Sequence, residues 1–314
     1  MESISRQHVP VMLEPVMKLL SCRAGGVYVD TTLGGGGYAR AILDASAPDG
    51  ILLALDWDAE ALVRAGKRLQ EYGRRLFLKQ ANFTDLSDVL RELDMRDADG
   101  IVMDLGVSSF HLEDAGRGFS FQHNGPLDMR MDQRKVRTAA DLVNSLSEED
   151  LRNLIHHLGE ERWARRIARA MVARRREGVF SGTRELADLI QGVVPKSRDA
   201  LRIHPATRTF QALRMAVNGE LENLRLFLAQ VLDLLQPGGR LIIVAFHSLE
   251  DRIVKQQFRT WANPCQCPPR LPRCQCAGTP LVRMLTNKVL RPGSEELELN
   301  PRSRSAKLRA VAKL

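Results

Sequence analysis

The stretch YVDTTLGGGGYAR, residues 28 to 40, sets four consecutive glycines directly after a short apolar run that predicts a strand. Glycine permits positive φ in a tight turn and removes the Cβ that would hold a ligand away from the backbone. Gly34, Gly36 and Ala39 also fit the G-x-G-x-x-G/A spacing of a dinucleotide-binding turn between a strand and a helix. The stretch therefore predicts a cofactor bound at the carboxyl end of this strand.

Two carboxylates narrow the choice of cofactor. Asp56 ends the strand-like ILLALD, 20 residues beyond Gly36, where it would accept hydrogen bonds from ribose hydroxyls. Asp30 lies four residues before Gly34, which is unfavourable beside a pyrophosphate but favourable beside a cationic sulfonium with an α-amino group. The pair favours S-adenosyl-L-methionine (AdoMet) over a nucleotide. A glycine turn without a ligand is the remaining alternative.

The composition predicts a globular protein with an anionic partner. The 314 residues include 46 Lys+Arg and 38 Asp+Glu, a net charge of +8, which favours a polyanionic binding partner. The N-terminus has no long apolar core of a signal peptide, and no run approaches the ~20 apolar residues that span a bilayer. We therefore expect a cytoplasmic protein with no membrane partner.

Strand-like apolar runs alternate with helical stretches, as in an α/β fold with a parallel sheet. The runs are GVYVD, GILLALD, RLFLKQ, DGIVMDLG and, after a long gap, GGRLIIVAF. The gap from Asp104 to Arg240 is too long for one crossover helix and predicts a helical insertion at 112–212, between core segments 1–111 and 213–314. NKVLRP and SAKLRAVAKL predict two short antiparallel strands that complete the sheet.

One helix of the insertion carries an arginine face. In EERWARRIARAMVARRRE, residues 160–177, an apolar stripe of Trp163, Ile167 and Met171 leaves Arg162, Arg166 and Arg169 on another face. Two readings stay open, a packed helix with a solvated arginine face and a helix that contacts phosphates.

Four cysteines cluster in CQCPPRLPRCQC, at positions 265, 267, 274 and 276. Paired thiols could hold a tetrahedral zinc ion, but the spacing is C-x-C rather than the usual C-x-x-C and no histidine assists. A loop of reduced thiols without metal is favoured for a cytosolic chain.

The whole chain resembles one family, the bacterial 16S ribosomal RNA cytosine-N4 methyltransferases (MraW/RsmH-like). The stretches that carry the resemblance follow one another in order: HVPVMLEPV, DTTLGGGGY, DLGVSS, RGFSF, GPLDMRMD, GEERWARRIARA, HPATRTFQALRM, FHSLEDRIVK and NPRSRSAKLR. The resemblance implies a Rossmann-like AdoMet-dependent methyltransferase sheet with antiparallel C-terminal strands and an inserted all-helical domain for substrate recognition. It also implies ribosomal RNA as partner, within the small ribosomal subunit, with a cytidine of the decoding region as target. A homodimer is compatible with it.

The resemblance places AdoMet contacts at seven positions: Gly36, Gly37, Tyr38, Asp56, Phe83, Asp104 and His111. Tyr38 stands where histidine is frequent, so a contact there would use the backbone. Phe-His at 110–111 replaces the usual Pro-Gln, which leaves the side-chain contact of His111 open. Phe83 follows the third strand, where its ring either covers adenine or packs in the core.

The reaction needs an acceptor for the amine proton of cytosine. The Asp-Pro-Pro-aromatic type of loop found in many amino-methyltransferases is replaced by DLGVSS, so the candidates are Asp104, a backbone carbonyl in residues 105–108, and His247 in FHSLED. His247 could equally be a structural histidine. Phe110, Phe119 and Phe121 are candidates to stack on an unstacked base.

Two further classes of function compete with this interpretation. A non-catalytic RNA-binding assembly factor could keep the same fold, and a nicotinamide oxidoreductase could share the glycine turn. Asp30 and the C-terminal strands argue against the oxidoreductase.

Overall fold

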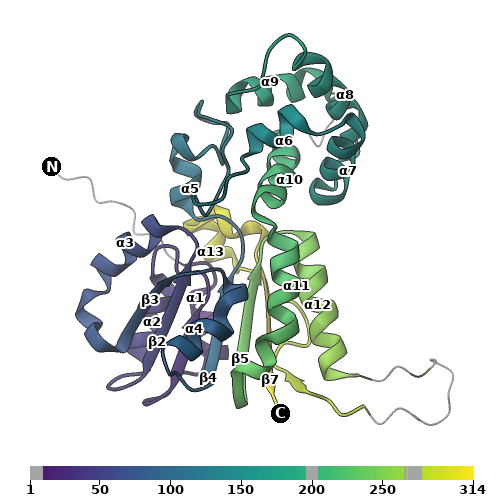
Figure 1. Cartoon of the computed structure of the whole chain (residues 1–314). Helices are drawn as coiled ribbons and strands as arrows, with labels where there is room; N and C mark the ends of the chain where they lie inside the picture. The colour runs from purple at the N-terminus through teal and green to yellow at the C-terminus, as the bar shows by residue number, and fades with distance from the viewer. Residues whose placement is uncertain (1–9, 196–203, 265–266, 268–277) are drawn as a thin grey trace. The chain divides into compact units, whose positions relative to one another are not determined.

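The computed structural model describes residues 10–195, 204–264, 267 and 278–314, which form two compact units (Figure 1). The first unit comprises Met1–Gly106 and Glu222–Leu314, and the second comprises Val107–Leu221. The expected helical insertion at 112–212 falls inside the second unit, which begins five residues earlier and ends nine residues later.

A seven-stranded sheet in the order β3-β2-β1-β4-β5-β7-β6 forms the centre of the first unit. The first five of these positions hold parallel strands, whereas β7 is antiparallel to both β5 and β6. The strands are β1 (Val27–Asp30), β2 (Ile51–Asp56), β3 (Leu76–Gln80), β4 (Ala98–Asp104), β5 (Leu235–Ala245), β6 (Val282–Met284) and β7 (Lys307–Lys313). The predicted α/β fold with an antiparallel C-terminal strand is confirmed.

The strand predicted at NKVLRP differs from the structure. The partner of β7 is β6, Val282–Met284, and from the predicted segment only Leu290 forms an isolated bridge, to Leu308. The backbone pairing with β7 is interrupted between β6 and Leu290 because the Thr286 hydroxyl accepts the Ala310 N–H at 2.9 Å. A side chain thus takes the place of a backbone acceptor.

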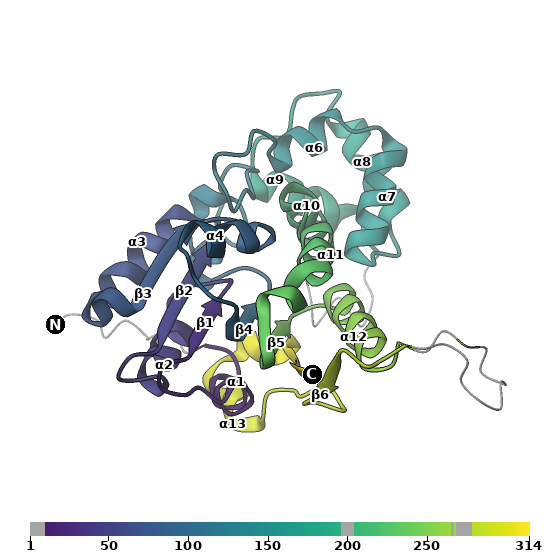
Figure 2. The same cartoon turned by 60° about the horizontal axis from the view of Figure 1, so that its bottom comes forward.

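Helices cover both faces of the sheet (Figure 2). α1 and α2 share a buried cluster with one face of β1, β4, β5 and β7, while α12 packs against β5, β6 and β7. The helices of this unit are α1 (Leu13–Leu20), α2 (Gly37–Ala45), α3 (Ala59–Arg68), α4 (Leu86–Glu92), α11 (Glu220–Gln230, which begins in the second unit), α12 (Ser248–Ala262) and α13 (Ser294–Leu299).

The second unit is helical. Its helices are α5 (Ser109–Glu113), α6 (Ala139–Ser145), α7 (Glu148–Gly159), α8 (Ala164–Arg174), α9 (Thr183–Val193) and α10 (Thr207–Asn218). Ser147 caps α7 by accepting the N–H of Asp150. In α8, Ile167 and Met171 are buried, which makes the predicted apolar stripe the core-facing side.

A brace of buried hydrogen bonds holds the loop before α6. The fully buried Asn218 accepts the N–H of Met131 at 2.9 Å and donates to the carbonyl of Met129 at 2.8 Å. Within the same loop, Arg130 forms a two-point ion pair with Asp128. These contacts give the DMRMD stretch a structural role inside the second unit.

Among the described helices, none combines the length and the apolar character that a membrane crossing requires.

Candidate functional site

Polar side chains gather where the parallel strands end. Because β1, β2 and β4 are parallel neighbours, their last residues, Asp30, Asp56 and Asp104, all lie at the carboxyl edge of the sheet. Ligands of open α/β sheets bind outside this edge.

The glycine loop between β1 and α2 needs residues without side chains. Gly34 and Gly36 have φ of +50° and +79°, the left-handed region that L-residues with side chains adopt at a cost. A Cβ on Gly36 would lie 3.1 Å from Leu69, and one on Gly37 would overlap the ring of Pro10. Gly36 is the N-cap of α2, so the loop delivers the free N–H groups of that helix to the carboxyl edge.

Asp56 ties this loop to the end of β2. Its Oδ2 accepts the N–H of Gly34 at 2.8 Å, and its Oδ1 accepts the N–H of Asp58 at 2.9 Å. Each carboxylate oxygen has a second lone pair, and the side chain is partly exposed. Asp56 is therefore fixed in position and still able to accept hydrogen bonds from ribose hydroxyls.

Asp30 is fully buried and Asp104 is half-buried, and each has one carboxylate oxygen that is not satisfied. Asp30 Oδ2 and Asp104 Oδ1 are inaccessible to solvent and have no hydrogen-bond partner in the described part of the chain. Burial raises the pKa of Asp30 to about 7, with a further contribution from Asp56. Burial also raises the pKa of Asp104 well above its usual range, helped by Asp30 and by Glu250.

Such a pair of acids is costly to bury unless a cation compensates it. A sulfonium with an α-amino group supplies positive charge, its carboxylate suits the N-terminus of α2, and its ribose suits Asp56. The residues at this edge therefore fit AdoMet, as the sequence predicts from Asp30.

His247 lies just beyond β5 as the N-cap of α12. Its Nδ1 accepts the N–H of Glu250 at 3.4 Å, and Glu250 in return accepts the N–H of Phe246 at 2.9 Å. His247 Nε2 is 2.9 Å from Glu250 Oε1, a distance typical of an ion pair, but the alignment does not make a hydrogen bond. The side chain thus has a structural role as a helix cap, and its role as proton acceptor stays a prediction.

Glu250 was not singled out from the sequence. It is almost fully buried and raises the pKa of Asp104. Its position three residues after the N-cap is the signal that could have identified it, because the third helical residue of a capping box is typically Glu or Gln.

Phe83 lies in an aromatic cluster. Its ring is 2% exposed and meets Trp57 and Phe227 edge-on, each at 5.6 Å between centroids. Core packing accounts for these contacts, and the proposed cover of adenine is an expectation that they do not test.

Tyr38 is also buried, and its hydroxyl donates a hydrogen bond to the carbonyl of Val11. Its side chain is thereby occupied, which leaves the backbone for the expected cofactor contact.

His111 belongs to the second unit, in α5. Its N–H donates to Ser108 Oγ at 3.3 Å, and its ring lies 4.9 Å from that of Phe119. Phe121, in the same unit, packs against His204 and Phe210 at 4.6 and 4.9 Å. Because these residues and the sheet lie in different units, the expected cofactor contact of His111 stays a prediction.

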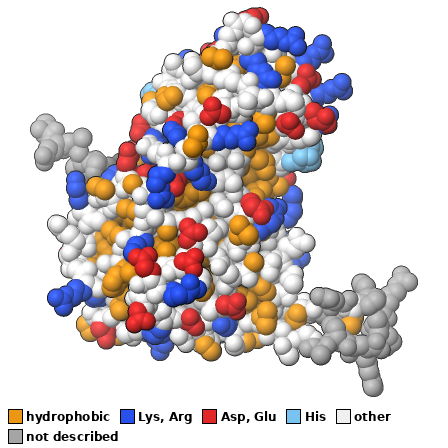
Figure 3. Space-filling model, in the orientation of Figure 1, with side chains coloured by type: hydrophobic (Ala, Val, Ile, Leu, Met, Phe, Trp, Pro, Cys, Tyr) orange, Lys and Arg blue, Asp and Glu red, His pale blue; other side chains and the backbone are white. Residues whose placement is uncertain are grey.

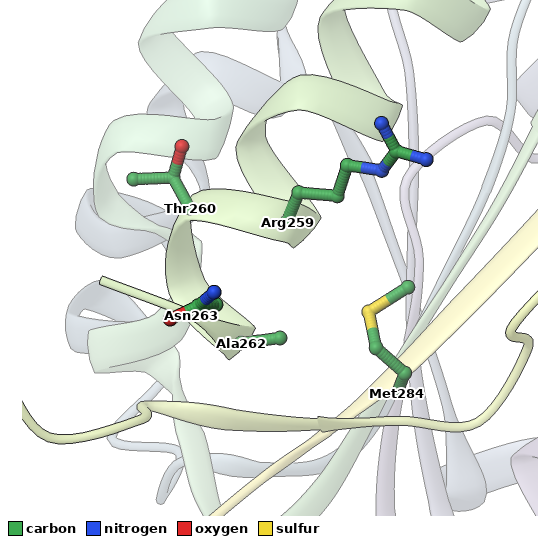
Figure 4. Close-up of a pocket in the computed structure, with 5 residues that line it drawn as sticks. All are labelled: Arg259, Thr260, Ala262, Asn263 and Met284. Atoms are coloured by element: carbon green, nitrogen blue, oxygen red, sulfur yellow. The ribbon is translucent and has the colours of Figure 1, made fainter. Parts of the chain in front are cut away.

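The predicted cysteine cluster lies outside the described residues except for Cys267, which is partly exposed. A pocket of about 410 Å³ lies nearby, between the last turn of α12 and β6 (Figure 4), lined by Arg259, Thr260, Ala262, Asn263 and Met284. It is at the opposite end of α12 from His247 and is therefore separate from the carboxyl edge.

Comparison with known proteins assigns the chain to a family. Residues 5–314 match the model of the MraW methylase family. The chain belongs to this family. A relative from Syntrophobacter fumaroxidans, named ribosomal RNA small subunit methyltransferase H, is 62% identical over 98% of this chain and 96% of its own length. A protein of the same name from Geotalea uraniireducens is 52% identical and covers 98% of both chains.

A solved rRNA methylase from Streptococcus thermophilus covers 96% of this chain and 93% of its own, with 12% identity and a TM-score of 0.40. At that level of likeness, the fold assignment rests on the sheet order and the family match. Membership of a methylase family, together with the residues at the carboxyl edge of the sheet, makes AdoMet the cofactor of this protein.

Replacing Asp56 should weaken cofactor binding. We expect Asp56→Ala to lower AdoMet affinity by roughly 1 to 3 kcal/mol, because ribose hydroxyls lose their acceptor and the loop loses the Gly34 hydrogen bond. Isothermal titration with AdoMet measures this, and Asp49→Ala, an acid at the amino edge that accepts the Gly25 N–H, is the control. Equal affinities of wild type and Asp56→Ala would remove Asp56 from the site.

Cofactor binding should depend on pH through Asp30. Its pKa of about 7 means that the carboxyl is neutral in acid, whereas a cationic ligand pairs with the ionised form. AdoMet affinity should therefore rise as pH increases from about 5.5 to about 7 and level off above it. The free energy of unfolding of the protein without cofactor should change in the opposite direction, because the folded state holds this proton more tightly than the unfolded state.

Asp30→Asn should weaken the pH dependence of both profiles, since the amide does not titrate while Asp104, whose pKa is also raised, still does. Titrations with AdoMet and urea unfolding across this pH range measure them. A variant that keeps the full pH dependence of affinity would contradict the role of Asp30.

Proposed function

We propose that the protein transfers the methyl group of AdoMet to the exocyclic N4 amine of a cytidine in the decoding region of 16S ribosomal RNA. The observation that supports this most strongly is family membership over almost the whole chain, with relatives of 50–62% identity named ribosomal RNA small subunit methyltransferases. The choice of N4 and of the decoding region rests on the chain-wide sequence resemblance. The proposal puts the protein in the cytoplasm, where bacterial ribosomal RNA is.

The transfer is an in-line displacement. The amine nitrogen attacks the methyl carbon as the carbon–sulfur bond breaks, which leaves S-adenosylhomocysteine and a proton to be removed from the amine. The cytosine amine is a poor nucleophile because its lone pair is delocalised into the ring, so positioning and an acceptor for the N–H are the main requirements.

Asp104 is the acceptor that the contacts support better. Its buried Oδ1 has no hydrogen-bond partner among the described residues, so in the ionised carboxylate this oxygen can accept the amine N–H. His247 Nδ1 already accepts the N–H of Glu250 as the cap of α12. In the neutral tautomer that allows this, Nε2 carries the proton, so neither ring nitrogen is left to accept the amine N–H. Asp104 would then serve both the cofactor and the amine.

The second unit offers a surface for the RNA. Lys and Arg side chains, blue in Figure 3, lie on the surface of this unit. The exposed arginines on and beside α8 are Arg162, Arg165, Arg166, Arg169 and Arg176. Arg166 and Arg169 are both exposed, so phosphates can reach their guanidinium groups. In the same unit, Phe110 and Phe121 are partly exposed and suit base stacking better than the buried Phe119.

Transfer of labelled methyl from AdoMet to naked 16S ribosomal RNA and to small subunits tests the proposal. Digestion of the product to nucleosides should yield N4-methylcytidine. RNA binding without methyl transfer to either substrate would favour an assembly factor, and a methyl group elsewhere on the RNA would replace the N4 assignment.

The two roles of His247 separate in one pair of variants. Asparagine is a good N-cap but cannot relay a proton near neutral pH. We expect His247→Asn to keep a single-turnover rate within about 3-fold of wild type and His247→Ala to lower helix stability by about 1 kcal/mol. A rate at least about 10²-fold lower in both, at saturating AdoMet and RNA, would instead make His247 the acid-base group.

Charge reversal on α8 should weaken RNA binding alone. We expect Arg166→Glu with Arg169→Glu to lower RNA affinity and to flatten its dependence on salt, because fewer counterions are released, while AdoMet affinity stays unchanged. The matched control reverses Lys67 and Arg74, two exposed cations of the first unit. If both double variants bind RNA alike, the α8 face is merely solvated.

A further inference from the structure

The segment Pro10–Met12 lies against the helix end that carries the predicted cofactor contacts. The ring of Pro10 occupies the position that a Cβ of Gly37 would take, and Gly37 is the first residue of α2. Val11 and Met12 are buried in the same cluster as α1 and α2. A ligand held by the first N–H groups of α2 therefore has Pro10 as its neighbour.

Two side chains hold this segment in place. The hydroxyl of Tyr38, the second residue of α2, donates to the carbonyl of Val11. From the other side, the Met12 N–H donates to Glu296 Oε1 of α13 at 2.5 Å. The segment is thus bonded at consecutive residues, once to the helix that meets the cofactor and once to a distant part of the chain.

The backbone of this segment requires such support. Met12 has φ of +55°, in the left-handed region that costs energy for a residue with a side chain. At its carboxyl end the segment continues directly into α1, which packs on β4 and β5. The Tyr38 and Glu296 contacts, on the two residues that follow Pro10, therefore oppose movement of Pro10 away from Gly37.

We infer that Pro10–Met12 forms a strap over the N-terminus of α2, and that Tyr38 and Glu296 are positioning residues that set how fast AdoMet leaves the site. The inference gives a task to the side chain at position 38 in addition to the backbone contact expected there. It rests on the binding of AdoMet at the glycine loop and not on the identity of the RNA.

The test measures the dissociation rate of AdoMet by rapid mixing with excess unlabelled cofactor. We expect Tyr38→Phe to speed dissociation by roughly 3- to 10-fold, the effect of losing one buried hydrogen bond. The control is Tyr28→Phe, which removes an equally buried hydroxyl that accepts the Arg23 N–H at 2.7 Å at the amino edge of the same sheet. It should lower the melting temperature to a similar degree and leave the dissociation rate unchanged.

A second pair of variants tests the other anchor. Glu296→Ala should speed dissociation, and Glu296→Gln should restore the wild-type rate because its amide oxygen can still accept the Met12 N–H. Equal dissociation rates for Tyr38→Phe and Tyr28→Phe, or a Glu296→Ala rate equal to wild type, would overturn the inference. A wild-type protein that binds no AdoMet would instead overturn the proposed site, so the two failures are distinguishable.

Discussion

The hydrogen bond from the Gly34 N–H to Asp56 joins the turn after β1 to the end of β2, and the candidate site depends on it. Positive φ at Gly34 and Gly36 turns the chain back toward the sheet, and the Asp56 carboxylate fixes the turned loop. The N-terminus of α2 is then held at the same edge of the sheet as Asp30 and Asp104, the acids that end β1 and β4. A cofactor with both positive and negative groups finds all of its partners at one edge, with little reorganisation required on binding.

The sequence was sufficient for the parts of this arrangement that follow from local chemistry. The glycine turn lies between a strand and a helix, and the acids Asp30, Asp56 and Asp104 end parallel strands, as the sequence predicts. The prediction of a strand at NKVLRP was wrong because the Thr286 hydroxyl accepts the Ala310 N–H in place of a backbone carbonyl. This interaction joins residues that lie far apart in the sequence.

The sequence could not predict which side chains of the site are buried or which distant residues they contact. From the sequence, Phe83 is equally compatible with a ligand contact and with a place in the core. Its contacts with Trp57 and Phe227 show that its ring is enclosed. The capping position of Glu250 follows from the sequence, but its effect on the pKa of Asp104 appears only once α12 places the two residues near each other. The Tyr38 hydroxyl, likewise, finds its acceptor in a segment that the sequence does not connect with α2.

The position of β7 has a consequence for the order in which the protein folds during synthesis. β7 pairs with both β5 and β6, so the sheet of the first unit stays open at β5 until residues 307–313 have left the ribosome. The second unit is one continuous stretch and has all its helices much earlier. The helical unit can therefore form while the nascent chain still lacks β7, and until β7 pairs with it the exposed edge of β5 is open to pairing with other strands.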